Sequence, residues 1–331
     1  MEIINSYNVK LTNINKSIID TINIYRKAVA FLIDIYNNEW TNLVSLNGKE
    51  KNNFAEKLVH KTNDNPTPSY DFDKLFYKFP SYLRRSAIQD ALGIVSSYRS
   101  NLDNYNKERY ESISNGKKFK KQCPKLSLKH FKCPALYKGN MFIKTGTYTG
   151  SIKIYKYNSK KKTYDWVWLP VQYRKTDIDY INKNCLDYKE MSPILIRKNR
   201  NVYLKFTFKK EVKLNSKKIK DQKVMGVDLG LNHSAVCSIM DLNGTVTNRL
   251  FINQPVEKDR LNRMLKHLRL KQKQSGYKAK MPKVWSKING LNTQITNDTV
   301  SKIINFAKEN EVDIIVFEYL DFKGKNLKTK L

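Results

Sequence analysis

The chain has 331 residues, enough for two or three domains, and its 40% hydrophobic content is typical of a folded protein. Its charge is unusual: 62 Lys and Arg against 30 Asp and Glu give a formal net charge of +32. This excess favours a polyanionic partner, first of all nucleic acid, over a merely lysine-rich composition. The sequence has no apolar run long enough to span a membrane, its start lacks the pattern of a signal peptide, so none is expected, and its isolated cysteines are typical of reduced thiols. We therefore expect a cytoplasmic protein, associated with the nucleoid when bound to DNA, and no membrane contact.

The N-terminal third predicts one strand followed by helices. Residues 1–11 contain a short strand, E-I-I-N-S-Y-N-V-K-L. From Ser17 to Trp40, apolar residues recur at three- and four-residue steps, which predicts an amphipathic helix. A second helix is expected from Ser81 to about Tyr105, directly after a proline that suits a helix start. We interpret residues 12–115 as a helical recognition module inserted after the first strand of a β-barrel.

The middle of the chain is strongly basic. Between Lys117 and Lys162 there are fourteen lysines and no Asp or Glu. Aromatic and β-branched residues alternate between them, as in S-I-K-I-Y-K-Y, which predicts short strands in a small antiparallel barrel over residues 116–218. A solvated face explains any single lysine, but the cluster favours phosphate contacts. The candidates here are Lys117, Lys118, Lys120, Lys121, Lys160, Lys161 and Lys162.

Residues 219–331 predict a separate α/β domain. The runs V-M-G-V-D-L-G, S-A-V-C-S-I-M-D and T-V-T-N-R-L-F-I predict three strands. A basic helix is expected from Val256 to about Lys273, then a loop-like stretch over 274–290 and a helix from about Leu291 to Asn310. The run D-I-I-V-F-E-Y-L is apolar on both faces, which predicts a central, buried strand. The nucleic-acid contacts expected from the basic helix are Arg260, Arg263, Lys266, Arg269, Lys271 and Lys273.

Two carboxylates stand inside apolar strands of this domain, Asp228 in the first and Glu318 in the fourth. If these strands are neighbours, the two like charges face each other, and a cation between them stabilises the arrangement. Oxygen ligands of this kind select Mg²⁺ or Mn²⁺. Three strands, a helical crossover and a fourth strand, with acids on the first and fourth, are typical of ribonuclease H-like nucleases that use two metals. A phosphate-binding D-L-G turn of a sugar-kinase-type or actin-like ATPase, and a structural Asp capping a turn, are the alternatives.

Several segments resemble one family. G-V-D-L-G-L-N at 226–232, W-S-K-I-N at 285–289, V-S-K-I-I-N-F-A at 300–307 and I-I-V-F-E-Y-L at 314–320 resemble the RuvC-like core of the TnpB (OrfB) proteins, transposon-encoded relatives of type V CRISPR effectors. L-R-R-S-A-I-Q-D-A resembles the family's recognition helices. P-I-L-I-R-K-N-R-N-V-Y-L-K-F-T-F resembles the strands that end its wedge barrel.

The resemblance implies a wedge barrel interrupted by recognition helices, a RuvC-like nuclease domain, a guide RNA, a DNA target and a functional link to a transposase. It implies that Asp228 and Glu318 are the first and second catalytic acids and metal ligands. It says nothing about oligomeric state.

The sequence also departs from the family pattern. The family has a third acid after a zinc ribbon of two C-x-x-C pairs, whereas only thirteen residues follow Glu318 here and neither feature is present. We therefore expect an RNA-guided DNA-binding protein with impaired cleavage, either a truncated nuclease or a nuclease-inactive binder, and no zinc. With no element to cover it, the run I-I-V-F is expected to expose apolar surface and a free strand edge.

Overall fold

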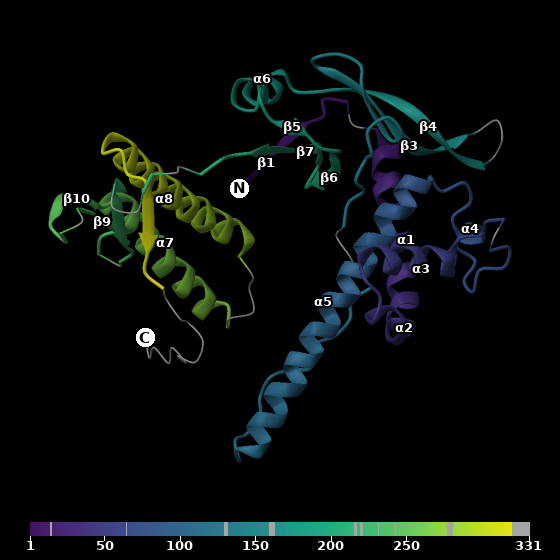
Figure 1. Ribbon diagram of the computed structural model, residues 1–331, viewed down its shortest axis with the longest axis horizontal. Helices are drawn as coiled ribbons and strands as arrows, with labels where there is room; N and C mark the ends of the chain where they lie inside the picture. The colour runs from purple at the N-terminus through teal and green to yellow at the C-terminus, as the bar shows by residue number, and fades with distance from the viewer. Residues whose placement is uncertain are drawn as a thin grey trace. The chain divides into compact units, whose positions relative to one another are not determined.

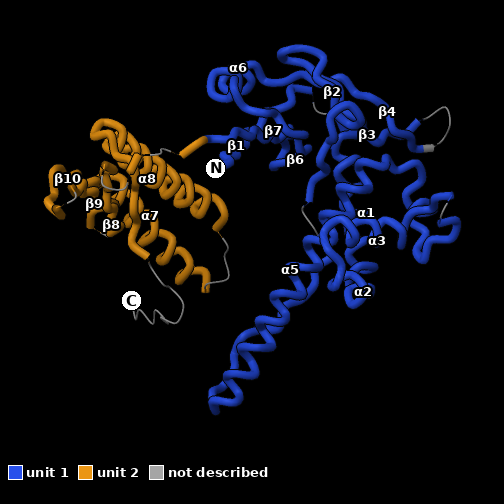
Figure 2. Tube along the Cα trace, in the orientation of Figure 1, with its two compact units in different colours: residues 1–212 blue, residues 213–331 orange. Residues whose placement is uncertain are grey.

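The structure is a computed structural model that divides into two compact units, Met1–Val212 and Lys213–Leu331 (Figure 2). Each unit has its own hydrophobic core. The residues that the structure describes are 1–13, 15–63, 65–128, 132–158, 163–214, 217–218, 221–230, 232–241, 243–276 and 281–319.

The first sheet of the N-terminal unit joins the two ends of that unit. Strand β1 (Glu2–Lys10) pairs antiparallel along its whole length with β7 (Asn201–Glu211). Strands β5 (Lys189–Glu190) and β6 (Ile194–Lys198) also pair with β7. The alternation of V-Y-L-K-F-T-F in β7 buries every second side chain, as a half-buried strand requires. The N-terminal strand therefore pairs with a strand some two hundred residues later in the chain. This is the pairing predicted between the first strand and the strands of residues 116–218.

The second sheet consists of β2 (Phe142–Lys144), β3 (Thr149–Asn158) and β4 (Thr163–Gln172). The predicted barrel is wrong, because this sheet and the first do not join into one closed sheet. Isolated bridges such as Leu11–Tyr173 link them, and side chains of both pack into one hydrophobic core. Helix α1 (Lys16–Asn38) explains why. The Tyr155 N–H, on the edge of β3 away from β4, donates to the Thr21 hydroxyl at 2.8 Å instead of to another strand.

The helical module packs α1 against α5 (Ser81–Ser114). Both helices were predicted, but the shorter helices α2 (Trp40–Val44), α3 (Gly48–Val59) and α4 (Phe72–Leu75), and α6 (Lys175–Asn184) beside β1, were not. The buried residues of α5 end at Val95, because the sequence after it carries no continuous apolar stripe. Figure 1 shows this second half of α5 extending away from the rest of the module, with the chain returning beside it.

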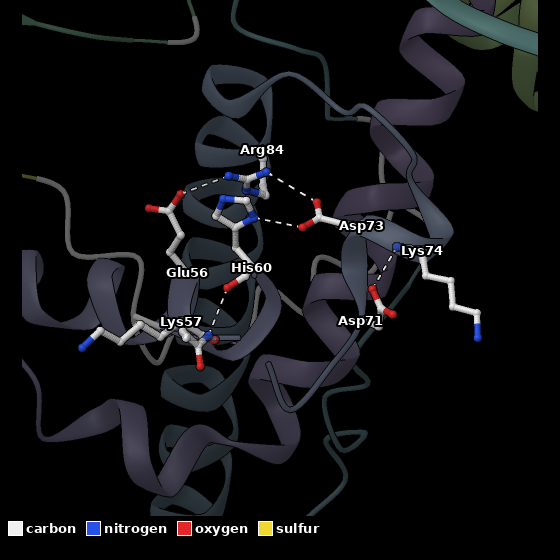
Figure 3. Close-up of polar contacts among 8 residues, drawn as sticks. Glu56, Lys57, His60, Asp71, Asp73, Lys74 and Arg84 are labelled. Atoms are coloured by element: carbon white, nitrogen blue, oxygen red, sulfur yellow. Dashed lines mark hydrogen bonds and ion pairs between the residues drawn. The ribbon is translucent and has the colours of Figure 1, made fainter. Parts of the chain in front are cut away.

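A buried arginine ties three helices of the module together (Figure 3). Arg84 of α5 is only 4% exposed, and its Nη2 lies 3.5 Å from Glu56 Oε1 of α3. Its Nη1 lies 3.6 Å from Asp73 Oδ1 of α4, whose other oxygen lies 3.0 Å from His60 Nδ1. A buried guanidinium is stable only when paired, so these two carboxylates fix α3 and α4 against the start of α5.

The C-terminal unit has the predicted order of elements. Strands β8 (Val224–Asp228), β9 (Ala235–Met240) and β10 (Val246–Ile252) form an antiparallel meander. Helices α7 (Pro255–Gln274) and α8 (Pro282–Glu309) follow, and β11 (Ile314–Phe317) then pairs parallel with β8. The sheet order is β10-β9-β8-β11.

Helix α8 begins nine residues earlier than Leu291, so the loop expected up to residue 290 is wrong in its second half. Pro282 occupies the first helical turn, where a proline is well tolerated, and Val284 and Ile288 extend the apolar stripe of the helix toward its N-terminus. The W-S-K-I-N segment is therefore helical.

Strand β11 is an edge strand, so the prediction of a central, buried strand is wrong. Its four residues are between 38% and 52% exposed, and β8 is its only partner strand in the described part of the chain. Among the described residues, the run I-I-V-F exposes apolar surface and pairs with no strand on its other edge. A strand with apolar residues on both faces is able to lie in the centre of a sheet. Whether it is buried depends on the strands and helices that lie beside it.

Candidate acidic pair and nucleic-acid interface

The two predicted acids follow the last paired residues of two adjacent parallel strands. Val227 of β8 is the register partner of Phe317 of β11, and the next residues along the two strands are Asp228 and Glu318. Because register partners in a parallel pair share a face, continued register places both carboxylates on the same face, on strands about 4.8 Å apart. Val227 packs into the core with α8, so the acids lie on the opposite face of the sheet.

Both carboxylates are exposed, although the apolar runs that carry them are typical of buried strands. Asp228 ends β8, where the chain leaves the sheet, and Glu318 follows an edge strand. Neither carboxylate has a hydrogen-bond or ion-pair partner among the residues that the structure describes. Their alignment therefore comes from strand register rather than from a need to neutralise buried charge.

The kind of ligand atom fits a hard divalent cation, since two carboxylates side by side offer the oxygen ligands that Mg²⁺ and Mn²⁺ prefer. Over the described ranges, no group of three or more His, Cys, Asp or Glu side chains is close enough to hold a metal ion. A cation at Asp228 and Glu318 would therefore complete its shell with water or with phosphate oxygens of a bound nucleic acid.

The six cations predicted on the basic helix lie on α7, and all of them are exposed. None takes part in an ion pair with any described residue. Three basic residues of α7, spaced three and four apart, face α8 across a groove of about 770 Å³. The groove is lined by the basic residues Arg260, Arg263, His267 and Lys287, and by apolar residues that include Met264 and Leu291.

The basic middle region is less uniform than its sequence indicates. Lys117, Lys118, Lys120 and Lys121 are exposed, but they lie in a segment without strand structure that returns along α5. Lys121 pairs with Glu108 of α5, and the ring of Phe119 contacts Tyr105 at 5.2 Å. Lys160, Lys161 and Lys162 lie outside the described residues.

Acids from elsewhere in the chain neutralise some lysines of this region, which corrects the expectation of an uncompensated cluster. Lys132 pairs with Asp90 of α5 at 3.0 Å. Lys138 and Lys144 both approach Glu190 of β5, at 2.9 and 3.8 Å. The helix α7 and the start of the returning segment therefore remain the stronger candidates for phosphate contact.

Sequence reasoning missed His267 and Lys287, which share the groove with the predicted arginines. The spacing of Arg260, Arg263 and His267 is a signal that could have identified one helix face. Lys287 could not be found in this way, because the stretch around it was interpreted as a loop.

Within the described ranges, no helix is long and apolar enough to cross a membrane.

Comparisons with known proteins give a partial match in sequence and a wider one in structure. The model of the Aq_aa04 family matches residues 4–156. A curated relative, the uncharacterized protein aq_aa04 of Aquifex aeolicus, is 33% identical over 102 residues, which cover 27% of this chain and 57% of the relative. The match to the family model concerns the strand β1, the helical module and the start of the second sheet, not the C-terminal unit.

Among solved structures, the chain is similar to Cas12f1 in a cryo-EM structure with sgRNA and target DNA, with a TM-score of 0.50 and 13% identity over 92% of this chain. The match covers 65% of the Cas12f1 chain, so this chain spans somewhat less than two thirds of it. A CRISPR-Cas12f ternary complex matches 92% of this chain with a TM-score of 0.27 and 13% identity. The first of these similarities shows a fold of the Cas12f1 kind.

Proposed function

We propose that this chain is a TnpB-like, RNA-guided DNA-binding protein in which Asp228 and Glu318 bind Mg²⁺ or Mn²⁺. The observation that carries the proposal is the register of β8 and β11, which aligns the two carboxylates on one face of a β10-β9-β8-β11 sheet. The similarity in fold to Cas12f1, whose structure contains sgRNA and target DNA, supports the choice of partners.

The electrostatics support a nucleic acid rather than a small substrate. Six exposed cations on α7 have no ion-pair partner within the described residues, and the net charge of the chain is +32. Cations that neutralise phosphates release the counterions condensed on the nucleic acid, so binding is expected to weaken steeply as salt increases. The groove between α7 and α8 is lined by both basic and apolar side chains, which suits a phosphate backbone with partly stacked bases.

A bound divalent cation would supply charge stabilisation and an activated water to phosphodiester chemistry. In this chain, Asp228 and Glu318 would hold it. Yet neither carboxylate receives a hydrogen bond from a described residue, and metal ligands generally depend on such partners for their orientation. We therefore propose that nucleic-acid binding dominates and that cleavage by this chain is weak.

Co-purification tests the proposal. The full chain, purified at low salt, is expected to carry a structured RNA, and the loaded protein is expected to bind a duplex complementary to part of that RNA. A chain that carries no RNA, and that prefers duplex DNA to RNA in competition, would count against it.

The same preparation decides between the remaining alternatives. Incubated with matching duplex and Mg²⁺ or Mn²⁺, it is expected to show little cleavage. Strong cleavage that disappears in Asp228→Ala would establish an active nuclease instead. Phosphate release from ATP tests the ATPase alternative, and none is expected.

A further inference from the structure

An aromatic surface runs along one face of the β3–β4 hairpin in the N-terminal unit. Cross-strand register pairs Tyr157 with Tyr164, Tyr155 with Trp166, and Lys153 with Trp168. Since alternate residues of a strand share a face, these six side chains lie on one side of the hairpin. On the other side, Ile152 and Ile154 are fully buried.

Four of the five rings of this surface, those of Tyr157, Tyr164, Tyr155 and Trp166, contact one another in a continuous row, and Trp168 lies on the same face beside Lys153. Tyr155 and Tyr164 are stacked, with ring centroids 4.6 Å apart and planes 8° apart. Tyr164 also meets Tyr157 edge-on at 5.2 Å, and Tyr155 contacts Trp166 at 5.3 Å. The row therefore presents aligned rings rather than scattered aromatic residues.

The outer aromatic side chains of this surface are exposed to solvent, whereas the inner ones are packed against neighbouring side chains. Tyr157, Tyr164 and Trp168 are 49%, 47% and 41% exposed. Trp166 is half-buried against Phe79, with ring centroids 5.5 Å apart. The inner rings thus fix the orientation of the outer ones, which lowers the entropic cost of using them to bind a ligand.

The charge on this face is positive. Lys153 Nζ lies 5.9 Å from the ring centre of Trp168. Exposed rings beside a lysine match unpaired nucleobases joined by phosphates, because bases stack on rings while a phosphate neutralises the cation. An apolar protein partner would gain nothing from this charge.

We propose that this aromatic row, Tyr157–Tyr164–Trp168 with Lys153, is a stacking site for the unpaired bases of a single-stranded nucleic acid. The proposal deepens the proposed function and rests on it, since it assigns unpaired nucleotides of the bound RNA or displaced DNA to the β3–β4 hairpin. It is separate from the phosphate contacts of α7.

Tryptophan fluorescence of the full chain tests this site. The probes are single-stranded oligouridylate and oligothymidylate of about ten nucleotides, a duplex of the same length, and inorganic polyphosphate. Stacking on Trp168 is expected to quench emission with both single strands but not with polyphosphate. The relative affinity of the protein for oligouridylate and oligothymidylate shows whether the site prefers single-stranded RNA or single-stranded DNA.

Variants assign the quenching and the affinity to this row. Tyr157→Ala and Trp168→Ala are each expected to weaken single-strand binding roughly five- to hundredfold. Tyr157→Phe, which keeps the ring, is expected to bind like the wild type. Tyr110→Ala is the matched control, because Tyr110 is an exposed tyrosine on α5, outside the row. Near-ultraviolet circular dichroism checks that each variant is folded.

If the folded variants Tyr157→Ala and Trp168→Ala bind single strands with unchanged affinity, the stacking site is refuted. The aromatic row would then serve only as cross-strand pairs that stabilise the hairpin. An equal loss of polyphosphate binding would overturn it as well, since stacking requires bases. Binding of structured RNA without any effect of these variants would leave the proposed function intact. Absence of all RNA binding would instead count against the proposed function.

Discussion

Val227 in β8 and Phe317 in β11 are register partners, and on each strand the next residue is a carboxylate. The alignment of Asp228 and Glu318 therefore depends on backbone hydrogen bonds between two parallel strands. Neither side chain contributes to the folding of its own strand by packing, because both are exposed.

Substitution of either acid is expected to abolish a metal site without unfolding the protein. Asp228→Asn and Glu318→Gln should each weaken Mn²⁺ binding at least tenfold, roughly the minimum effect of losing even a supporting contact at a metal site. Titration calorimetry with Mn²⁺ measures this. Asp259→Asn, an exposed acid on α7, is the control and should bind Mn²⁺ as the wild type does. Equal affinity in all three variants would contradict the site.

Substitution in the groove between α7 and α8 is expected to reduce nucleic-acid affinity and its salt dependence together. Arg263→Gln removes one exposed cation that pairs with no described acid. If it contacts a phosphate, the slope of log K against log salt should fall by roughly 0.7 to 0.9. Lys302→Gln on α8 is the control, because Lys302 already pairs with Asp298 at 2.9 Å. A change of affinity at unchanged slope would argue against a phosphate contact.

Removal of the buried arginine in the helical module is expected to destabilise the N-terminal unit. Arg84→Ala eliminates contacts to Glu56 and Asp73, and we expect the free energy of unfolding to fall by about 2–3 kcal/mol. Arg85→Ala should cost less than about 1 kcal/mol, because its side chain is 56% exposed and contacts Glu56 only at 3.6 Å. Urea denaturation followed by circular dichroism compares the two, and equal losses would refute the role of burial.

The module is also expected to lose stability at high pH. Burial raises the pKa of the Tyr25 and Tyr36 hydroxyls far above the usual value of about 10, and the nearby Asp90 and Glu56 carboxylates raise it further. The folded state therefore holds these protons more tightly than the unfolded state. Their stabilisation is fully present below about pH 10 and is lost as the pH rises beyond it.

Tyr36→Phe tests this dependence. The variant should lose about 1 kcal/mol at neutral pH, because the Tyr36 hydroxyl donates to the Ala55 carbonyl oxygen at 3.1 Å. Above pH 10 the free energy of unfolding should decline less steeply for the variant than for the wild type. The two slopes should differ by up to about 1.4 kcal/mol per pH unit. Urea unfolding at pH 8 to 11 measures both. Tyr110→Phe, at an exposed position, should show the wild-type slope.

The sequence by itself determined the elements whose patterns are local. Apolar residues at helical spacing predicted α1, α7 and the first half of α5. The order of three strands, a helical crossover and a fourth strand suggested the hypothesis that the strands of Asp228 and Glu318 are neighbours, which the sheet order bears out. Periodicity and order along the chain suffice for such features, since each depends on residues close in sequence or on connection rules.

Only the tertiary structure decided what covers each element. Helix α1 occupies the edge of β3 and keeps the two N-terminal sheets from closing into a barrel. Strand β11 lies at an edge, which exposes I-I-V-F and Glu318, and Asp228 is exposed where β8 ends. Glu108, Asp90 and Glu190 reach lysines that lie in a segment without acids of its own. Burial and charge pairing are properties of neighbours in space, so a pattern along the chain cannot encode them alone.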